Sequence, residues 1–240
     1  MNPHLRAPLD VRLPVALARL HWSSAVGERR VVELDLAESP EPVPVPVEDL
    51  LAGAGFRVCE ANPEASRYTV ERLRTLPDTV GVGMWALICG LNPSLVAADA
   101  GFGYAGPTNR FWGAAEAAAV VSVPRDPLRA LLVDGVGMTD LVKRATPSAD
   151  ALARAEYEAG AARVAALVEW LRPGAVVFVG LAGWRAAVDA KAVAGWQPSP
   201  FGGRPAYVLP STSGLNAHTS RAQLEDHLRA AVNSPPPPLT

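Results

Sequence analysis

The sequence is short of cysteine and histidine, and both shortages exclude kinds of chemistry. Its 2 cysteines, Cys59 and Cys89, are too few for a disulfide framework, a four-cysteine zinc site or an iron–sulfur cluster built from this chain alone. Cys89 lies in an apolar run, where a buried and unreactive thiol is expected. The 4 histidines are scattered and show no metal-ligand spacing such as HxxxH. We therefore expect no metal site and no cofactor.

Long apolar runs are also missing. No run approaches the ~20 residues needed to span a bilayer, and the first residues lack the basic stretch and apolar core of a secretory signal. With 49% hydrophobic and 19% charged residues, the chain can bury a sizeable core. These features predict a globular protein of the cytoplasm without a membrane contact.

Lysine is scarce as well, because Lys143 and Lys191 are the 2 lysines among 22 basic residues. Arginine therefore supplies nearly all of the positive charge, and its planar guanidinium group suits phosphates and base edges. The net charge of −2 decides neither for nor against a DNA-binding face.

The sequence pattern changes near residue 80. Residues 1–80 predict a small α+β segment with a strand at 30–37, a proline-rich extended loop, a short helix at 47–55 and two further strands before residue 75. This order weakly resembles the last elements of nucleoside-methyl-donor methyltransferase domains. A glycine-rich donor-binding turn is missing from residues 1–80, so the resemblance implies at most a remnant with no activity.

Residues 81–233 alternate between predicted strands and helices. Continuous apolar runs predict buried strands at 85–89, 175–179 and 206–209, while helical spacing predicts helices at 112–120, 151–171 and 220–232. Ser220 and Gln223 have the spacing of a capping box. We predict a three-layer α/β/α fold with a mostly parallel central sheet, preceded by the N-terminal segment and followed by a disordered tail at 234–240.

Two loops that leave predicted strand ends are rich in small residues. The first begins with Gly90-Leu-Asn-Pro-Ser94 and continues to Trp112, and the second is Leu209-Pro-Ser-Thr-Ser-Gly-Leu-Asn216. Ligands of open α/β sheets bind outside the carboxyl ends of the strands, and small residues let a ligand approach backbone N–H groups. We therefore place the site on these two loops.

Four blocks together resemble one known family. They are GLNPS (90–94), GFGYAGPTNRFW (101–112), GVGMTDLVKRAT (135–146) and LPSTSGLN (209–216). In this order and at these separations they resemble the mismatch-specific uracil/thymine-DNA glycosylases of the uracil-DNA glycosylase superfamily, over residues 82–232. The resemblance implies the uracil-DNA glycosylase-like fold and an enzyme that acts on double-stranded DNA.

The resemblance also assigns roles to single residues. Asn92 matches the asparagine that positions the attacking water, Tyr104 the aromatic that stacks on the flipped base, and Leu215 the wedge that fills the vacated stack. Two positions depart from the family pattern, because Thr212 stands where many members have proline and Ala217 where an arginine often stands. The full set of predicted site residues is catalytic Asn92 and Asp140; base-binding Gly90, Leu91, Tyr104 and Asn109; and DNA-binding Ser211, Thr212, Ser213, Gly214, Leu215, Asn216 and His218.

Elementary chemistry fits these roles. A base inside a duplex must be extruded before its bond to the sugar can be cleaved, which costs a few kcal/mol, and a leucine on a small-residue loop can offset part of that cost. Backbone donors can stabilise the anionic leaving base. Asn92 cannot act as a general base, because a carboxamide accepts no proton at neutral pH. It can orient a water molecule.

Each assignment has a structural alternative. Asn92 and Pro93 could form a simple turn, Tyr104 could be a core aromatic, and Leu215 could be a capping hydrophobe. Asp140 could begin a helix. The remaining alternatives concern Asn109, which could tie its loop together or cap the next helix, and His218, which could face solvent.

One further motif is not a dinucleotide-binding site, because its position in the predicted fold is wrong. Residues 101–106 formally read GxGxxG, but a dinucleotide fingerprint must lie directly at a strand-to-helix turn, and here the predicted strand ends about ten residues earlier.

We expect a monomeric, nucleoid-associated glycosylase that excises uracil, and related damaged pyrimidines such as ethenocytosine, from mismatched double-stranded DNA. It should leave an abasic site, because Lys143 and Lys191 lie outside both loops and cannot form a Schiff base there. The alternative is a non-catalytic protein that binds DNA lesions. We also expect residues 1–78 to be dispensable for activity.

Overall fold

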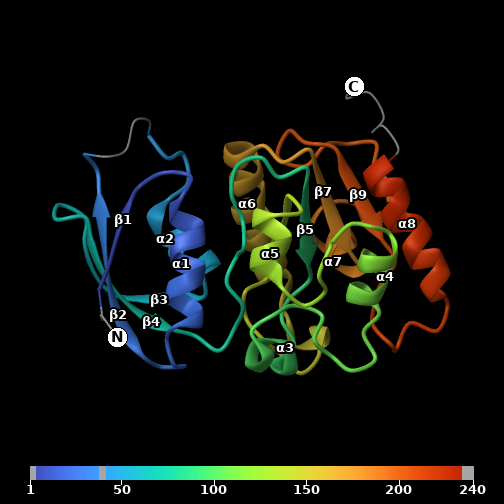
Figure 1. Cartoon of the computed structure of the whole chain (residues 1–240), viewed down its shortest axis with the longest axis horizontal. Helices are drawn as coiled ribbons and strands as arrows, with labels where there is room; N and C mark the ends of the chain where they lie inside the picture. Colours follow the sequence, from blue (N-terminus) through green and yellow to red (C-terminus); the bar gives the residue numbers. More distant parts are fainter. Residues whose placement is uncertain (1–3, 38–41, 234–240) are drawn as a thin grey trace.

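The computed structural model describes residues 4–37 and 42–233 and divides them between two sheets (Figure 1). The predicted disordered tail at 234–240 lies outside these described residues. The elements of the N-terminal part are β1 (His4–Pro8), α1 (Leu13–Trp22), β2 (Arg29–Asp35), α2 (Val47–Gly53), β3 (Phe56–Asn62) and β4 (Arg67–Arg72).

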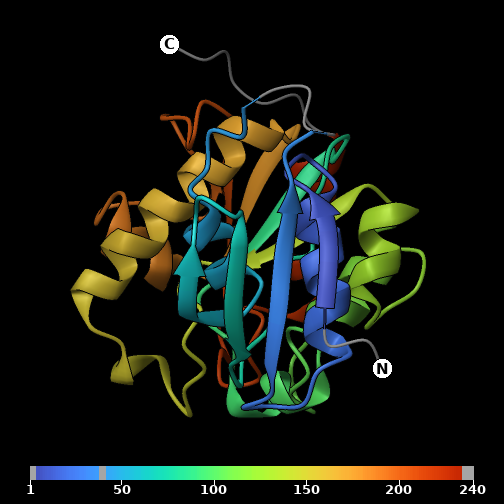
Figure 2. The same cartoon turned by 90° about the vertical axis from the view of Figure 1, so that its left-hand side faces the viewer.

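The N-terminal sheet has the strand order β1-β2-β4-β3. β1 and β2 are parallel, whereas β4 is antiparallel to both β2 and β3. Buried and exposed residues alternate along β2 and β4, as expected for a sheet with one covered face. Figure 2 looks onto the other face, with α1 and α2 behind it. The weak methyltransferase resemblance of residues 1–80 stays a prediction.

The C-terminal part is built on a five-stranded sheet with the order β6-β5-β7-β9-β8. All pairs are parallel except β8 with β9. Its elements are β5 (Ala86–Gly90), α3 (Leu95–Ala100), α4 (Phe111–Ala117), α5 (Pro127–Leu132), β6 (Val136–Asp140), the 3-10 turn Ala149–Ala151, α6 (Arg154–Leu171), β7 (Ala175–Val179), α7 (Leu181–Ala187), β8 (Gly195–Trp196), β9 (Ala206–Leu209) and α8 (Arg221–Asn233).

Apolar layers cover both faces of this sheet, which confirms the three-layer α/β/α prediction. On one face, α4 and α8 pack through residues such as Phe111 and Leu224. On the other face, residues of α6 and α7 pack against β5 and β7. That second core continues without interruption into Leu17 of α1, Leu51 of α2 and Val32 of β2. The N-terminal part is therefore not a separate domain joined by a linker, because it shares a hydrophobic core with the C-terminal part.

Most predicted elements lie where the sequence pattern put them. The strands at 175–179 and 206–209 are confirmed, and that at 85–89 lies one residue later than predicted. The capping box is confirmed, since Ser220 Oγ accepts from the Gln223 N–H at 3.2 Å and Gln223 Oε1 accepts from the Ser220 N–H at 2.7 Å. The sequence analysis did not predict β1, α1, α3, α5, β6, α7 or β8. Among the described residues, no helix is long and apolar enough to cross a membrane.

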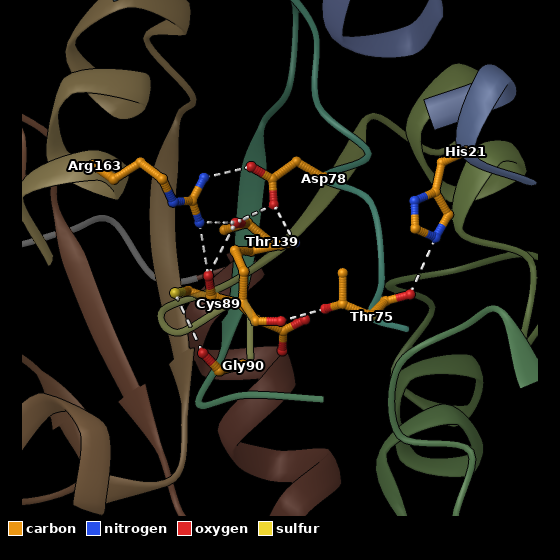
Figure 3. Close-up of polar contacts among 9 residues, drawn as sticks. His21, Thr75, Asp78, Cys89, Gly90, Thr139 and Arg163 are labelled. Carbon is orange, nitrogen blue, oxygen red and sulfur yellow. Dashed lines mark hydrogen bonds and ion pairs between the residues drawn. The ribbon is translucent and has the colours of Figure 1, made fainter. Parts of the chain in front are cut away.

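A buried carboxylate joins the two parts of the chain (Figure 3). Asp78 is 5% exposed, and its backbone N–H donates to the carbonyl of Gly53 at the end of α2, at 2.8 Å. Its side chain accepts from Arg163 Nη1 at 2.6 Å, from Lys143 Nζ at 2.8 Å and from Thr139 Oγ1 at 2.7 Å. Three elements of the C-terminal part therefore meet on one residue of the connecting segment.

The two cations decide the charge state of Asp78. Burial alone would raise the pKa of this carboxyl, but Arg163 and Lys143, together with hydrogen bonds from Lys143 and Thr139, hold the pKa below its usual value of 3.8. The carboxylate is thus ionised in the folded chain. Its stabilising effect is present above its usual pKa and is lost as the pH falls through the lower folded pKa.

Replacing Asp78 by asparagine should strongly destabilise the whole chain. The change leaves two cations buried without their counter-charge, which typically costs about 3–5 kcal/mol. Equilibrium urea unfolding at pH 7 measures this loss. The matched control is Asp99→Asn, because Asp99 also pairs with an arginine, Arg74, at 2.6 Å, but on the surface. We expect little change in the control, and an equal loss in both variants would contradict the buried-pair account.

Candidate active site

A cleft of about 240 Å³ opens at the carboxyl ends of β5 and β6. Four segments that are distant in the sequence form its walls: Leu76 in the segment after β4, the loop after β5, the end of β6 and the loop after β9. Its lining includes all four predicted base-binding residues, together with other residues of the predicted site. The base-binding residues are Gly90, Leu91, Tyr104 and Asn109, and the others are Asn92, Asp140, Ser213 and Gly214.

The loop after β5 is held in place by the chain that follows β6. The N–H groups of Leu141 and Val142 donate to the carbonyls of Gly90 and Leu91, both at 2.9 Å. Further along, the Thr146 N–H donates to the Pro93 carbonyl at 3.1 Å. The parallel pairing of β5 with β6 is thereby extended past the ends of both strands, and this fixes the backbone around Asn92.

The carboxamide of Asn92 is oriented by two acceptors on that same chain. Its Nδ2 donates to the Thr146 hydroxyl at 2.8 Å and to the Arg144 carbonyl at 3.0 Å. The Thr146 hydroxyl in turn donates to the Ser148 carbonyl at 2.8 Å, so it can only accept from Asn92. A carbonyl also only accepts, which settles that the amide nitrogen faces them. Oδ1 therefore points away from these acceptors and can accept a hydrogen bond from a water molecule.

Tyr104 is held in a strained backbone conformation. Its φ of 59° lies in the left-handed region, which costs a non-glycine residue roughly 1–2 kcal/mol. The ring stacks on Phe111 with a centroid distance of 4.1 Å and an interplanar angle of 27°, and it also lines the cleft. Tyr104 is thus both a packed aromatic, as the alternative stated, and a wall of the cleft.

Asp140 is the last residue of β6 and not the first residue of a helix, so the helix-start alternative is wrong. Its side chain reaches the floor of the cleft, where a Cβ on Gly90 would collide with the carboxylate and crowd the Tyr104 hydroxyl. Glycine is therefore required at position 90. Burial, partly opposed by Lys143 and reinforced by the Asp78 carboxylate, raises the pKa of Asp140 to about 6. This carboxyl group changes its charge close to neutral pH.

Asn109 and Leu91 shape the cleft from either side. Asn109 Oδ1 accepts from the Phe111 N–H at the start of α4, at 2.9 Å, so the helix-capping alternative is correct for this oxygen. Leu91 fits against Gly183 of α7, where a Cβ would meet the leucine side chain. Both residues line the cleft, and their contact with a base stays a prediction.

The loop after β9 is tied internally and held by an arginine. Arg110 donates through its guanidinium to the carbonyls of Ser213 at 3.0 Å and Asn216 at 2.8 Å, and also to that of Thr219. Asn216 Nδ2 donates to the Ser211 carbonyl at 2.8 Å. A Cβ on Gly214 would collide with Thr108, so the loop packs directly against the loop after β5.

Side-chain exposure separates the predicted DNA-binding residues. Leu215 is 96% exposed at the tip of this rigid loop, whereas Thr212 is 2% exposed. The Thr212 side chain is thus buried, and the residue holds its loop through its carbonyl, which accepts from the Arg110 N–H at 3.0 Å. His218 lies on the surface, as its alternative stated. Asn216 acts within the loop through its side chain.

The sequence analysis missed Thr146 and Arg110, although both stand in the quoted blocks. Their hydrogen bonds to distant loops leave no mark in a local pattern. Leu76, which lies in the cleft wall, was also missed, and it belongs to the N-terminal part.

Residues 83–234 match the family profile described as "Uracil DNA glycosylase superfamily". This is more than half of the chain, so the protein belongs to that superfamily. A solution NMR structure of a candidate uracil DNA glycosylase from Methanosarcina acetivorans is also similar, with 20% sequence identity and a TM-score of 0.43 over 66% of this chain and 97% of that one.

Thr146→Val should slow base release by roughly 10- to 100-fold, because the Asn92 carboxamide loses the hydroxyl that fixes its rotation and misplaced groups carry penalties of this size. Thr146→Ser keeps the hydroxyl and should restore most of the rate. Single-turnover excision from a uracil-containing duplex measures both variants, beside the affinity for that duplex. An unchanged rate in Thr146→Val, or a serine variant as slow as the valine variant, would contradict the orienting role.

Proposed function

We propose that the protein is a monofunctional glycosylase that flips and excises uracil from mismatched double-stranded DNA and leaves an abasic site. Related damaged pyrimidines such as ethenocytosine belong to the proposed substrates, and the proposed setting is the nucleoid. The observation that carries the proposal is the oriented Asn92 carboxamide beside the Asp140 carboxyl in one cleft at the strand ends.

The cleft suits a base that has been extruded from the DNA duplex better than a base that is still stacked inside it. It is a hollow with Tyr104 in one wall, and flipped bases are commonly stacked on aromatic side chains. Leu215 stands on the neighbouring loop with its apolar side chain almost fully in solvent. Inserting such a side chain into the vacated stack offsets part of the cost of flipping.

Cleavage then separates charge in the cleft. The bond between the sugar C1′ and the base nitrogen breaks, the electron pair leaves with the base, and the sugar becomes cationic at C1′. Oδ1 of Asn92 orients a water molecule whose oxygen attacks C1′. Asp140, ionised above a pKa of about 6, stabilises the cationic sugar and takes the proton that this water releases. Passing this proton on to the anionic base completes the hydrolysis.

The two lysines support a reaction that stops at the abasic site. A lyase would need a free amine to attack C1′. Lys143 is 13% exposed and bound to the Asp78 carboxylate, and Lys191 follows α7, away from the residues that line the cleft. Neither amine is placed to attack C1′ of the sugar.

A panel of duplexes with single G·U, A·U, G·T and ethenocytosine lesions tests the proposal. After incubation with the intact chain, one half of each sample is treated with alkali to cleave abasic sites and the other half is not. We expect cleavage of the G·U duplex only after alkali, and loss of that cleavage in Asn92→Ala. Tight binding without base release on every duplex would favour a lesion-binding protein and overturn the proposal.

The excision rate should rise with pH through about 6 and then level off, because the raised pKa of Asp140 places its ionisation there. Asp140→Asn should remove this limb and lower the plateau. The same variant should be more stable than the parent above pH 6, since the folded state disfavours the ionised carboxylate, and equally stable below the usual pKa. Rate profiles, and urea unfolding at pH 5 and pH 8, measure both effects, and the gain in stability should be smaller at pH 5, which lies between the usual and the raised pKa. A variant that is less stable at pH 8, with its acid limb intact, would exclude this role.

Leu215→Ala should slow excision most where the lesion is well paired. The loss should be larger for A·U, if that pair is a substrate, than for the G·U wobble, and should nearly vanish on single-stranded uracil, which has no stack to fill. Single-turnover rates on the three substrates measure this, beside thermal melting. A uniform loss together with a lower melting temperature would show that Leu215 is a packing residue.

A further inference from the structure

The N-terminal part reaches the active-site loop through an indole. Trp22, the last residue of α1, donates its Nε1–H to the Gly101 carbonyl at 2.9 Å. The acceptor lies just before Tyr104, on the loop after β5. The family match begins at residue 83, so this contact comes from outside the glycosylase domain.

A second indole holds the same loop from within the domain. Trp112 donates its Nε1–H to the Gly103 carbonyl at 2.8 Å. The two tryptophans therefore grip the backbone on either side of Phe102, directly before the strained Tyr104. A residue with a positive φ persists only where its surroundings over-determine it, and these two hydrogen bonds supply such a constraint.

The segment that follows β4 adds further contacts. Leu76 is buried and its side chain would be 3.8 Å from a Cβ on Gly103. The Thr75 hydroxyl donates to the Lys143 carbonyl, on the chain that orients Asn92. Arg74 forms an ion pair with Asp99 of α3 at 2.6 Å. Three consecutive residues thus touch the segment after β5 and the chain after β6.

We infer that the N-terminal part is a working component of the glycosylase site, in which Trp22 is a positioning residue that sets the base-stacking Tyr104. This inference rests on the proposed function, because the rate measurements that test it require glycosylase activity. It also reverses the expectation that residues 1–78 are dispensable.

The test is Trp22→Phe in the full chain, which keeps an aromatic ring and removes the N–H donor. One lost hydrogen bond predicts a roughly twofold to tenfold slower single-turnover excision from a G·U duplex. The duplex concentration for half-maximal rate should not change, because the loop at 211–216 is untouched. The matched control is Trp85→Phe, since Trp85 donates its Nε1–H to the Asp134 carbonyl at 2.8 Å, before the start of β5. The control should keep the parental rate.

A double-mutant cycle with Tyr104→Ala separates positioning from general destabilisation. If Trp22 acts through Tyr104, its replacement should have almost no effect on rate once Tyr104 is gone. The same fold loss in both backgrounds would overturn the inference.

Amide hydrogen exchange gives a readout that needs no activity. In Trp22→Phe, exchange should accelerate in the peptide that covers residues 99–106 and stay unchanged in β7 and β9. Faster exchange throughout the chain, or none in that peptide, would contradict the inference. If the unmodified chain releases no base, the proposed function fails, while exchange still decides whether Trp22 holds the loop.

Discussion

The ion cluster around Asp78 is the interaction on which the rest of the structure depends. A carboxylate that is 5% exposed is tolerated only because Arg163 of α6 and Lys143, on the chain after β6, neutralise it and Thr139 adds a hydrogen bond. Each partner comes from a different element. The cluster therefore fixes where the connecting segment meets the C-terminal part, and with it the position of residues 74–76 beside the cleft.

The same cluster bears on the chemistry. The Lys143 amine is held in an ion pair with Asp78 and is therefore not free to act as a nucleophile in the cleft. The negative charge of Asp78 also contributes to the raised pKa of Asp140, although burial contributes more. One buried carboxylate thus helps to keep a second carboxyl group poised to change charge near neutral pH. Stability and reactivity are linked through a single hydrogen-bonded network.

The elements that the sequence predicted are those whose patterns are local. Apolar runs locate the strands at 175–179 and 206–209, and the Ser220–Gln223 spacing locates α8. α1 was missed because Pro14 stands in its first turn, where a proline reads as a break although it is compatible with a helix start. α3 was missed because a helix of 6 residues inside a loop of small residues has no room for a periodic pattern.

The residues of the candidate site can also be divided into those that a local sequence pattern predicts and those that it does not. Five cleft residues were predicted because they stand in contiguous blocks: Gly90, Leu91, Asn92, Tyr104 and Asn109. The oriented amide of Asn92 could not be predicted, since its partner Thr146 is 54 residues away. The contact of Trp22 with Gly101 spans 79 residues and joins a segment without motifs to a segment full of them. Only the folded chain brings these groups together.

The two parts of the chain form one cooperative unit around a shared site, because they share a hydrophobic core and the Asp78 cluster. The most direct measurement is pulsed hydrogen exchange with mass spectrometry along a urea titration, which follows peptides from β2 and β4 beside peptides from β5 and β7. The account predicts that both sets lose protection at the same urea concentration, because Asp78 and the shared core unfold together. Separate midpoints, with β5 and β7 still protected after β2 and β4 have opened, would contradict it.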